Sequence, residues 1–140
     1  MDVTELADRL AIADLLTAYT RAVDTGNFEA LHEVFTPDAV MDYSSVGGPV
    51  GPPAEVVPWV AEGLAGFAKV QHLLGQLDVR LAGDRAEVTA YFTNPMVAVA
   101  PDGTESLFEC GGYYHHRLIK TAAGWRSVSL VDDVLWSRGF

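Results

Sequence analysis

The sequence predicts an α+β fold in which three helices come first and a long, mainly antiparallel β-sheet follows. Apolar residues recur at three- and four-residue steps in the N-terminal part of the chain, and polar and apolar residues alternate through most of the C-terminal half. The composition, 49% hydrophobic and 20% charged residues, is typical of a globular protein. A length of 140 residues predicts one domain that spans residues 1–140.

The first helix is predicted to begin after Asp2, which can cap it with Glu5 at the third helical position. Apolar residues continue at helical spacing through residues 6–23, so the helix should end near Gly26. A short second helix, residues 27–35, should stop at the Thr-Pro-Asp sequence, because the residue before a proline avoids the helical conformation.

Residues 39–43 then predict a strand, and a glycine- and proline-rich stretch follows at residues 44–53. This composition predicts an irregular loop or lid. A third helix is expected over residues 55–64, where Pro58 is tolerated because it lies in or near the first turn.

The rest of the chain predicts a meander of strands joined by short turns at residues 83–84, 101–103 and 121–124. We expect the sheet to be strongly curved and to fold over the three helices. The expected strands cover residues 69–81 with a break near Gly75, residues 86–100, residues 107–120 and residues 125–131.

Charge and segment patterns exclude several classes of partner. Nine basic and nineteen acidic residues give a net charge of -10, which repels nucleic acid and anionic membranes. No apolar run approaches the ~20 residues of a membrane span, and the acidic N-terminus lacks a signal peptide, so we expect a cytoplasmic protein. The single cysteine, Cys110, excludes an internal disulfide and is best interpreted as a small buried residue.

Three segments carry a resemblance to a known superfamily: residues 19–31, residues 34–43 and Gly124-Trp125-Arg126. They resemble the first two helices, the following strand and the final strand of nuclear transport factor 2-like, or SnoaL-like, domains. The resemblance implies a cone-shaped fold around an apolar pocket for a small hydrophobic molecule, and a homodimer. It does not fix the activity, because the superfamily includes unrelated enzymes and proteins without catalysis.

Within the superfamily the sequence is most similar to the dehydratase branch, which includes scytalone dehydratase and the bile acid 7-alpha-dehydratases. Tyr19, Asp24 and His72 match positions at the end of the first helix and on the first strand after the third helix. The segments 70–72 and 132–136 also look like scytalone dehydratase. The second histidine of that enzyme falls near Phe92 here, which is a departure. The resemblance implies removal of water without cofactor or metal.

Elimination of water next to a carbonyl needs a base for the carbon-bound proton, an acid for the hydroxyl, and a donor for the enolate oxygen. We assign His72 as base and acid, because a neutral imidazole is usable near neutral pH. Asp24 would orient it. Tyr19 and Tyr43 would donate hydrogen bonds to the carbonyl oxygen.

Structural interpretations of the same residues remain open. Tyr19 and Asp24 are five residues apart, about 140° around a helix, so they do not share one face. Asp24 could simply end the helix before its turn. His72 alternates with Val70 and Leu74 on an apolar strand face, where a lone histidine is often a core residue.

Asp42 and Tyr43 present a choice, because neighbours on a strand point to opposite faces. Asp42 pointing inward would resemble ketosteroid isomerase, in which a carboxylate at this place moves a proton between carbons. The position of that enzyme's protonated aspartate falls near residues 110–111, so its arrangement is incomplete here. We expect Tyr43 to point inward and keep Asp42 as the alternative.

The leading hypothesis is a cofactor-independent lyase that dehydrates a small hydrophobic cyclic substrate of polyketide or steroid type. The alternatives are a polyketide cyclase or double-bond isomerase that uses Asp42, and a non-catalytic ligand-binding or dimerisation module. His115 and His116 lack the further ligands of a metal site, so none is expected. Expected substrate-binding residues in the apolar wall are Trp59, Phe67, Phe92, Met96, Phe108, Tyr113 and Trp136.

Overall fold

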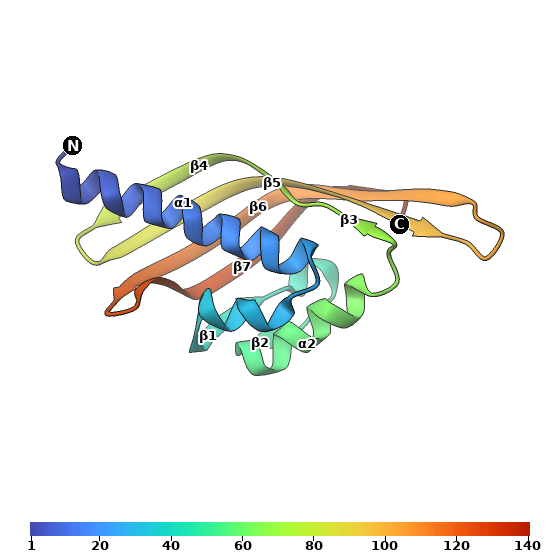
Figure 1. Cartoon of the computed structure of the whole chain (residues 1–140), viewed down its shortest axis with the longest axis horizontal. Helices are drawn as coiled ribbons and strands as arrows, with labels where there is room; N and C mark the ends of the chain where they lie inside the picture. Colours follow the sequence, from blue (N-terminus) through green and yellow to red (C-terminus); the bar gives the residue numbers. More distant parts are fainter.

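The computed structural model describes all 140 residues, and its elements follow the predicted order of helices before sheet (Figure 1). The helical part contains α1 (Val3–Asp24), η1 (Phe28–Glu33), η2 (Ser44–Val46) and α2 (Pro53–Leu64), with β1 (Phe35–Asp42) and β2 (Val50–Gly51) between them. The remaining strands are β3 (Lys69–Val70), β4 (Leu73–Ala82), β5 (Arg85–Val99), β6 (Glu105–Thr121) and β7 (Gly124–Arg138).

The strands form one mixed, mostly antiparallel sheet in the order β2-β1-β7-β6-β5-β3, with β4 also paired to β5. The exception to antiparallel pairing is β1, which runs parallel to β7. This pairing brings the N-terminal third of the chain beside the C-terminal strand, so that Asp42 lies opposite Val131. Tyr43, which follows β1, therefore lies close to the middle of β7.

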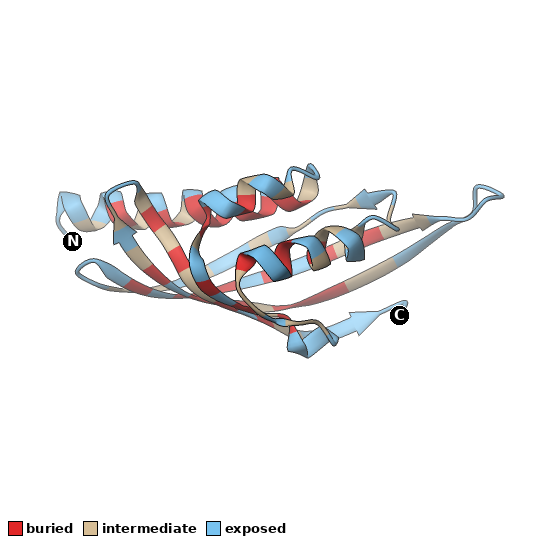
Figure 2. Ribbon diagram, turned by 90° about the horizontal axis from the view of Figure 1, so that it is seen from below, coloured by how far each residue is buried: buried red, intermediate tan, exposed pale blue.

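Helices α1 and α2 lie on the same face of the sheet and leave the other face uncovered (Figures 1 and 2). The buried residues lie on the sides of the helices and sheet that face one another (Figure 2). Ile12 and Leu16 of α1 are 0% and 1% exposed, and full burial of such a side chain contributes roughly 1.5–3 kcal/mol. The spacing of these apolar residues fixes which face of α1 meets the sheet.

The N-terminal part of α1 is fixed by two sets of contacts. Asp2 Oδ1 accepts a hydrogen bond from the backbone N–H of Glu5 at 2.8 Å, as the sequence predicts. Asp8 accepts from Trp125 Nε1 at 3.1 Å and from Lys120 Nζ at 2.8 Å, which attaches α1 to the β6–β7 hairpin. The bond from Lys120 holds the pKa of Asp8 below its ordinary value. The far end of α1 is held separately, by the hydrogen bond that the backbone N–H of His72 donates to Asp24.

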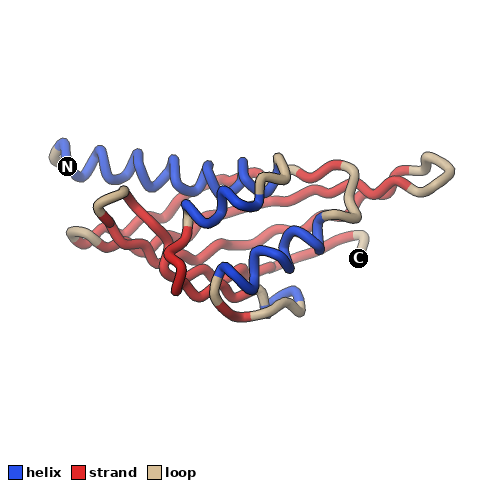
Figure 3. Tube along the Cα trace, turned by 60° about the horizontal axis from the view of Figure 1, so that its bottom comes forward, coloured by secondary structure: helices blue, strands red, loops and turns tan.

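The glycine- and proline-rich stretch contains more regular structure than its composition predicts. Residues 44–46 form the single turn η2, and β2 pairs with the end of β1 in the register Met41 to Gly51. The strand β1 also begins at Phe35, earlier than expected, and the second helix is a 3₁₀ helix that turns beside α2 (Figure 3). Pairing of β1 with β2 and β7, which local composition does not encode, explains the two differences in the strands.

Two further corrections concern the strands around the candidate site. The final strand continues to Arg138, seven residues beyond the expected end, because its tail pairs with β6. The strand expected over residues 69–81 is interrupted at Gln71 and His72. His72 lies in this gap and not on the expected strand, because its backbone N–H is bonded to α1 and not to the sheet. Near Gly75 the pairing of β4 with β5 only shifts register.

Candidate functional site

A largely apolar cavity of about 290 Å³ lies between the C-terminal half of α1, helix α2 and the covered face of the sheet. Such a volume is close to the lower end of the roughly 300–1,000 Å³ typical of small-molecule sites. Eighteen residues line it: Tyr19, Val23, Tyr43, Val46, Trp59, Val60, Gly63, Leu64, Phe67, His72, Phe92, Asn94, Met96, Cys110, Tyr114, Asp132, Val134 and Phe140.

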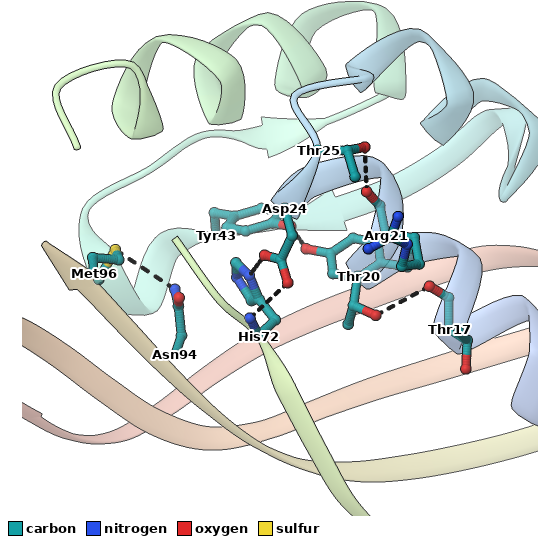
Figure 4. A network of polar contacts seen from close by, with 10 residues as sticks. Thr17, Thr20, Arg21, Asp24, Thr25, Tyr43, His72, Asn94 and Met96 are labelled. Carbon is teal, nitrogen blue, oxygen red and sulfur yellow. Dashed lines mark hydrogen bonds and ion pairs between the residues drawn. The ribbon is translucent and has the colours of Figure 1, made fainter. Parts of the chain in front are cut away.

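Asp24 and His72 are joined by two hydrogen bonds at one side of this cavity (Figure 4). His72 Nδ1 lies 2.6 Å from Asp24 Oδ1, and the His72 backbone N–H donates to Asp24 Oδ2 at 2.8 Å. The side chain of His72 is 5% exposed, and that of Asp24 is 17% exposed. Helix α1 ends at Asp24, so its carboxylate can reach past the last turn to the β3–β4 gap.

This geometry determines which imidazole nitrogen is free. Because the carboxylate of Asp24 accepts from Nδ1, the favoured tautomer of His72 carries its proton there. The other nitrogen, Nε2, makes no hydrogen bond within the protein, and the ring lines the cavity. His72 therefore presents a proton acceptor to whatever occupies the cavity.

Tyr19 and Tyr43 form a second polar group on the cavity wall, where their hydroxyl groups are hydrogen-bonded to each other. Burial raises the pKa of Tyr19, and burial also raises the pKa of Tyr43 well above its ordinary value. Both phenols therefore stay protonated at neutral pH, so that within the pair one hydroxyl donates and the other accepts. Tyr114 lies beside them, with its ring 5.4 Å from that of Tyr19.

The structure places Tyr43 at the cavity and Asp42 outside it. Asp42 accepts a hydrogen bond from the backbone N–H of Ser44 at 2.9 Å, and bonds from Ser44 hold the pKa of this carboxyl below its ordinary value. The alternative in which Asp42 points into the cavity as a base is therefore wrong, because the alternation along β1 points its side chain away from the cavity.

Most of the expected apolar wall is found in place, with three corrections. Trp59, Phe67, Phe92 and Met96 line the cavity, whereas Phe108 lies behind Phe67 at 5.6 Å between ring centres.

Tyr113 and Trp136 lie on the uncovered face of the sheet. Tyr113 packs against Tyr91 on that face, 4.9 Å between ring centres, while Tyr114 stacks on Phe92 inside at 4.0 Å. Trp136 packs over Gly111, also on the uncovered side. The alternation of β6 therefore makes Tyr114, and not Tyr113, a wall residue.

Asp132 is a cavity residue to which sequence reasoning gave no role. It is 6% exposed, and its Oδ1 atom has no hydrogen-bond partner. Burial, followed by the charges of Asp133 and Asp42, raises the pKa of Asp132 to about 7. The sequence signal was weak, because alternation can place Asp132 on the covered face only once β7 is known to continue past Val131. Asn94 Oδ1 is a second unpaired buried atom on the cavity wall.

The two consecutive histidines of β6 do not join the site. His116 is buried away from the cavity with Nδ1 2.8 Å from Ser127 Oγ, and burial lowers the pKa of its imidazole to about 3. His115 lies on the uncovered face, with Nε2 3.0 Å from Asp133 Oδ2. No group of three or more His, Cys, Asp and Glu side chains is arranged to hold a metal ion. No helix is long and apolar enough to cross a membrane.

Residues 4–131, almost the whole chain, match the SnoaL-like domain. The chain belongs to the SnoaL-like domain family. An uncharacterized protein of Mycobacterium tuberculosis is 39% identical to this SnoaL-like chain over 132 residues, which are 94% of this chain and 88% of that protein.

Solved structures of related proteins have the same fold. An NTF2-like protein with a cystatin-like fold from Novosphingobium aromaticivorans is 26% identical, with a TM-score of 0.70 over 96% of this chain and 90% of that one. A candidate aromatic ring hydroxylase from the same species is 32% identical, with a TM-score of 0.83 over 96% and 94% of the two chains. A candidate scytalone dehydratase, also from that species, is 14% identical, with a TM-score of 0.88 over 100% and 92%. The SnoaL-like chain therefore has the NTF2-like α+β fold.

Proposed function

We propose that this SnoaL-like protein is a cofactor-independent lyase that removes water from a small, hydrophobic, cyclic β-hydroxy ketone. The observation that carries the proposal is the hydrogen-bonded Asp24–His72 pair at the edge of an apolar cavity. A ketone acidifies the carbon next to it, and a hydroxyl one carbon further can leave as the double bond forms. The cavity thus combines a base with room for an apolar ring.

His72 is the base in this reaction. Its free Nε2 takes the proton from the carbon next to the carbonyl, and Asp24 stabilises the imidazolium that results. Asp24 also fixes the ring orientation, because one carboxylate binds both the backbone and the side chain of His72. A positioned base of this kind contributes about 10²–10⁴-fold to the rate.

Tyr19 and Tyr43 hold the carbonyl oxygen. The raised pKa of each phenol keeps its proton in place; one proton is used in the hydrogen bond between the two hydroxyls, and the other is free to donate a hydrogen bond to the developing enolate. Their shared hydrogen bond brings both hydroxyl groups to one place. The base and these donors all line one cavity, as an elimination next to a carbonyl requires.

The comparisons support a cyclic substrate. The dehydratase among the structural neighbours suggests the reaction class, and the aromatic ring hydroxylase suggests a ring compound as ligand. The cavity of about 290 Å³ favours one or two rings over a larger skeleton. The position of Asp42 outside the cavity argues against an isomerase that uses it, and the open cavity with its paired histidine argues against a purely structural module.

The test is turnover of 3-hydroxy-1-tetralone, which loses water to give 1-naphthol and is followed by naphthol fluorescence. We expect His72→Ala and Asp24→Asn each to lower the rate by at least about a hundredfold, with unchanged circular dichroism. His115→Ala is the matched control, because His115 lies on the uncovered face beside a different aspartate. Full activity in both site variants would show that the pair is not catalytic.

A further inference from the structure

The side chain of Asp132 lies on the covered face of β7, at the same cavity as His72. Asp132 pairs across the sheet with Tyr114, whose ring is inside, and its neighbour Asp133 binds His115 on the other face. The hydroxyl of Ser45 donates to the backbone carbonyl of Asp132 at 2.5 Å, which fixes this part of β7 against η2. The backbone carbonyl of Asp132 is thus hydrogen-bonded, while its side-chain carboxyl group lies at the cavity.

The carboxyl of Asp132 is deeply buried and incompletely bonded. At 6% exposure, with Oδ1 unpartnered, it has no cation or donor to stabilise a negative charge. An unpaired buried carboxylate is costly, so the neutral acid is favoured. The titratable groups that act on it or share the cavity wall with it are phenols, a thiol, other acids and one imidazole, namely Tyr19, Tyr43, Tyr114, Cys110, Asp42, Asp133 and His72. None of these groups donates a hydrogen bond to Oδ1 of Asp132.

We propose that Asp132 is the catalytic acid of the site and delivers its proton to the hydroxyl oxygen that leaves the substrate. The inference rests on the proposed dehydration and adds to it a second acid-base residue. The sequence had given His72 both roles. In the structure, Nδ1 of His72 is engaged by Asp24 and Nε2 must be unprotonated to act as base, so the histidine holds no spare proton when the reaction starts.

The other donors at the cavity are too weakly acidic for this role. Burial raises the pKa of Tyr19, Tyr43 and Tyr114, and it raises the pKa of Cys110 to about 11. The pKa of Asp132, about 7, is matched to proton transfer near neutral pH. The phenols can therefore hold the carbonyl oxygen while Asp132 gives up its proton.

The step is balanced in atoms and charge. The C–H bond breaks and its proton goes to His72 Nε2, while the electron pair forms the new C=C bond. The C–O bond breaks, and the departing oxygen takes the proton of Asp132 and leaves as water. The products are an unsaturated ketone, a His72 imidazolium and an Asp132 carboxylate, and return of one proton from His72 to Asp132 through solvent restores the site.

The experiment compares two leaving groups, 3-hydroxy-1-tetralone and 3-chloro-1-tetralone, because chloride leaves without a proton. We expect Asp132→Asn to lower turnover of the hydroxy compound at least about a hundredfold and to change turnover of the chloro compound, after subtraction of spontaneous loss, less than threefold. His72→Ala should slow both. With the wild type, turnover of the hydroxy compound should fall as pH rises through about 7, where Asp132 loses its proton.

Each outcome has a distinct meaning. Equal loss of both reactions in Asp132→Asn, or loss of neither, overturns the role of Asp132 while the base role of His72 stands. A wild type that converts neither compound, or a His72→Ala variant that keeps both activities, overturns the proposed dehydration itself.

A stability measurement tests the protonated state without any substrate. The pKa of Asp132 is raised from 3.8 to about 7 on folding, so the unfolded chain ionises first and folded-state stability falls between about pH 4 and pH 7. Asp132→Asn removes this loss, and its melting temperature should exceed that of the wild type by a margin that grows from pH 5 to pH 8. A constant margin would mean that Asp132 is ionised when folded, and that result would also overturn the proposal.

Discussion

At the scale of single residues, the hydroxyl groups of Tyr19 and Tyr43 play different parts in the hydrogen bond between them, since one donates its proton and the other accepts. Two hydroxyls that share one hydrogen bond use one proton between them, so the second proton is free for a carbonyl oxygen in the cavity. Tyr43 is also held by its ring contact with Trp59, 5.5 Å between ring centres. Its position at the cavity follows from packing against α2 as well as from the end of β1.

We predict that Tyr43→Phe lowers kcat by about 10²-fold, because it breaks the hydroxyl pair that places a donor at the developing enolate, and leaves KM within a few-fold of the wild type. The measurement is steady-state turnover of 3-hydroxy-1-tetralone. Tyr113→Phe is the matched control, since Tyr113 lies on the uncovered face. A rise in KM with unchanged kcat would contradict the assigned role and leave only substrate binding.

At the scale of elements, the pairing register of β6 with β7 decides which residues of the C-terminal tail face the cavity. The register between these strands shifts at Gly111 and Gly112. A Cβ atom at Gly112 would lie 2.0 Å from the backbone oxygen of Asp133. Glycine is therefore required for this close approach of two backbones. Val134, before the shift along β7, lines the cavity, and Trp136, after it, lies on the uncovered face.

We predict that Gly112→Ala lowers the free energy of unfolding by at least about 1–3 kcal/mol, which is the cost typical of an overpacked interior. The reason is that backbone atoms of β7, unlike a flexible side chain, cannot move aside cheaply. Urea unfolding followed by circular dichroism measures the effect. Gly63→Ala in α2 is the control, because a Cβ there meets nothing within 4 Å and alanine is favoured in a helix. Equal stability of the two variants would contradict the argument.

At the scale of the whole molecule, the two faces of the sheet differ in what covers them. The helices and the cavity occupy one face, while the other carries exposed apolar side chains around a groove of about 360 Å³. Leu73, Tyr91, Leu135 and Trp136 are between 41% and 67% exposed on this outer face. A contiguous apolar patch of this kind favours association, and the simplest partner of matching shape is a second copy in a symmetric dimer.

We predict a homodimer that buries the outer face, and Tyr91→Glu should convert it to a monomer. A charge in the centre of a buried apolar patch has no partner, so it costs more than the association can offset. Size-exclusion chromatography with light scattering measures the mass. Val3→Glu adds the same charge at an exposed residue near the N-terminus of α1 and should remain dimeric. A monomeric wild type at tens of micromolar would refute the expected dimer.

The sequence by itself determined the class of fold and the order of elements, because both depend on local signals. Helical spacing in residues 6–23, alternation in the later strands and the capping Asp2 each act within a few residues. It also pointed to Asp24 and His72, though only through resemblance to a family. The alternation rule made Asp42 and Tyr43 mutually exclusive, without deciding between them.

Only the tertiary structure decided which side chains meet. Asp24 and His72 are 48 residues apart, and their contact depends on where α1 ends over the β3–β4 gap. The parallel pairing of β1 with β7 places Tyr43 at the cavity, and the continued pairing of β7 with β6 places Asp132 on its wall. Such positions are fixed by packing between distant segments. The burial that gives Asp132 its unusual proton affinity is a property of the folded surroundings and is absent from the chain order alone.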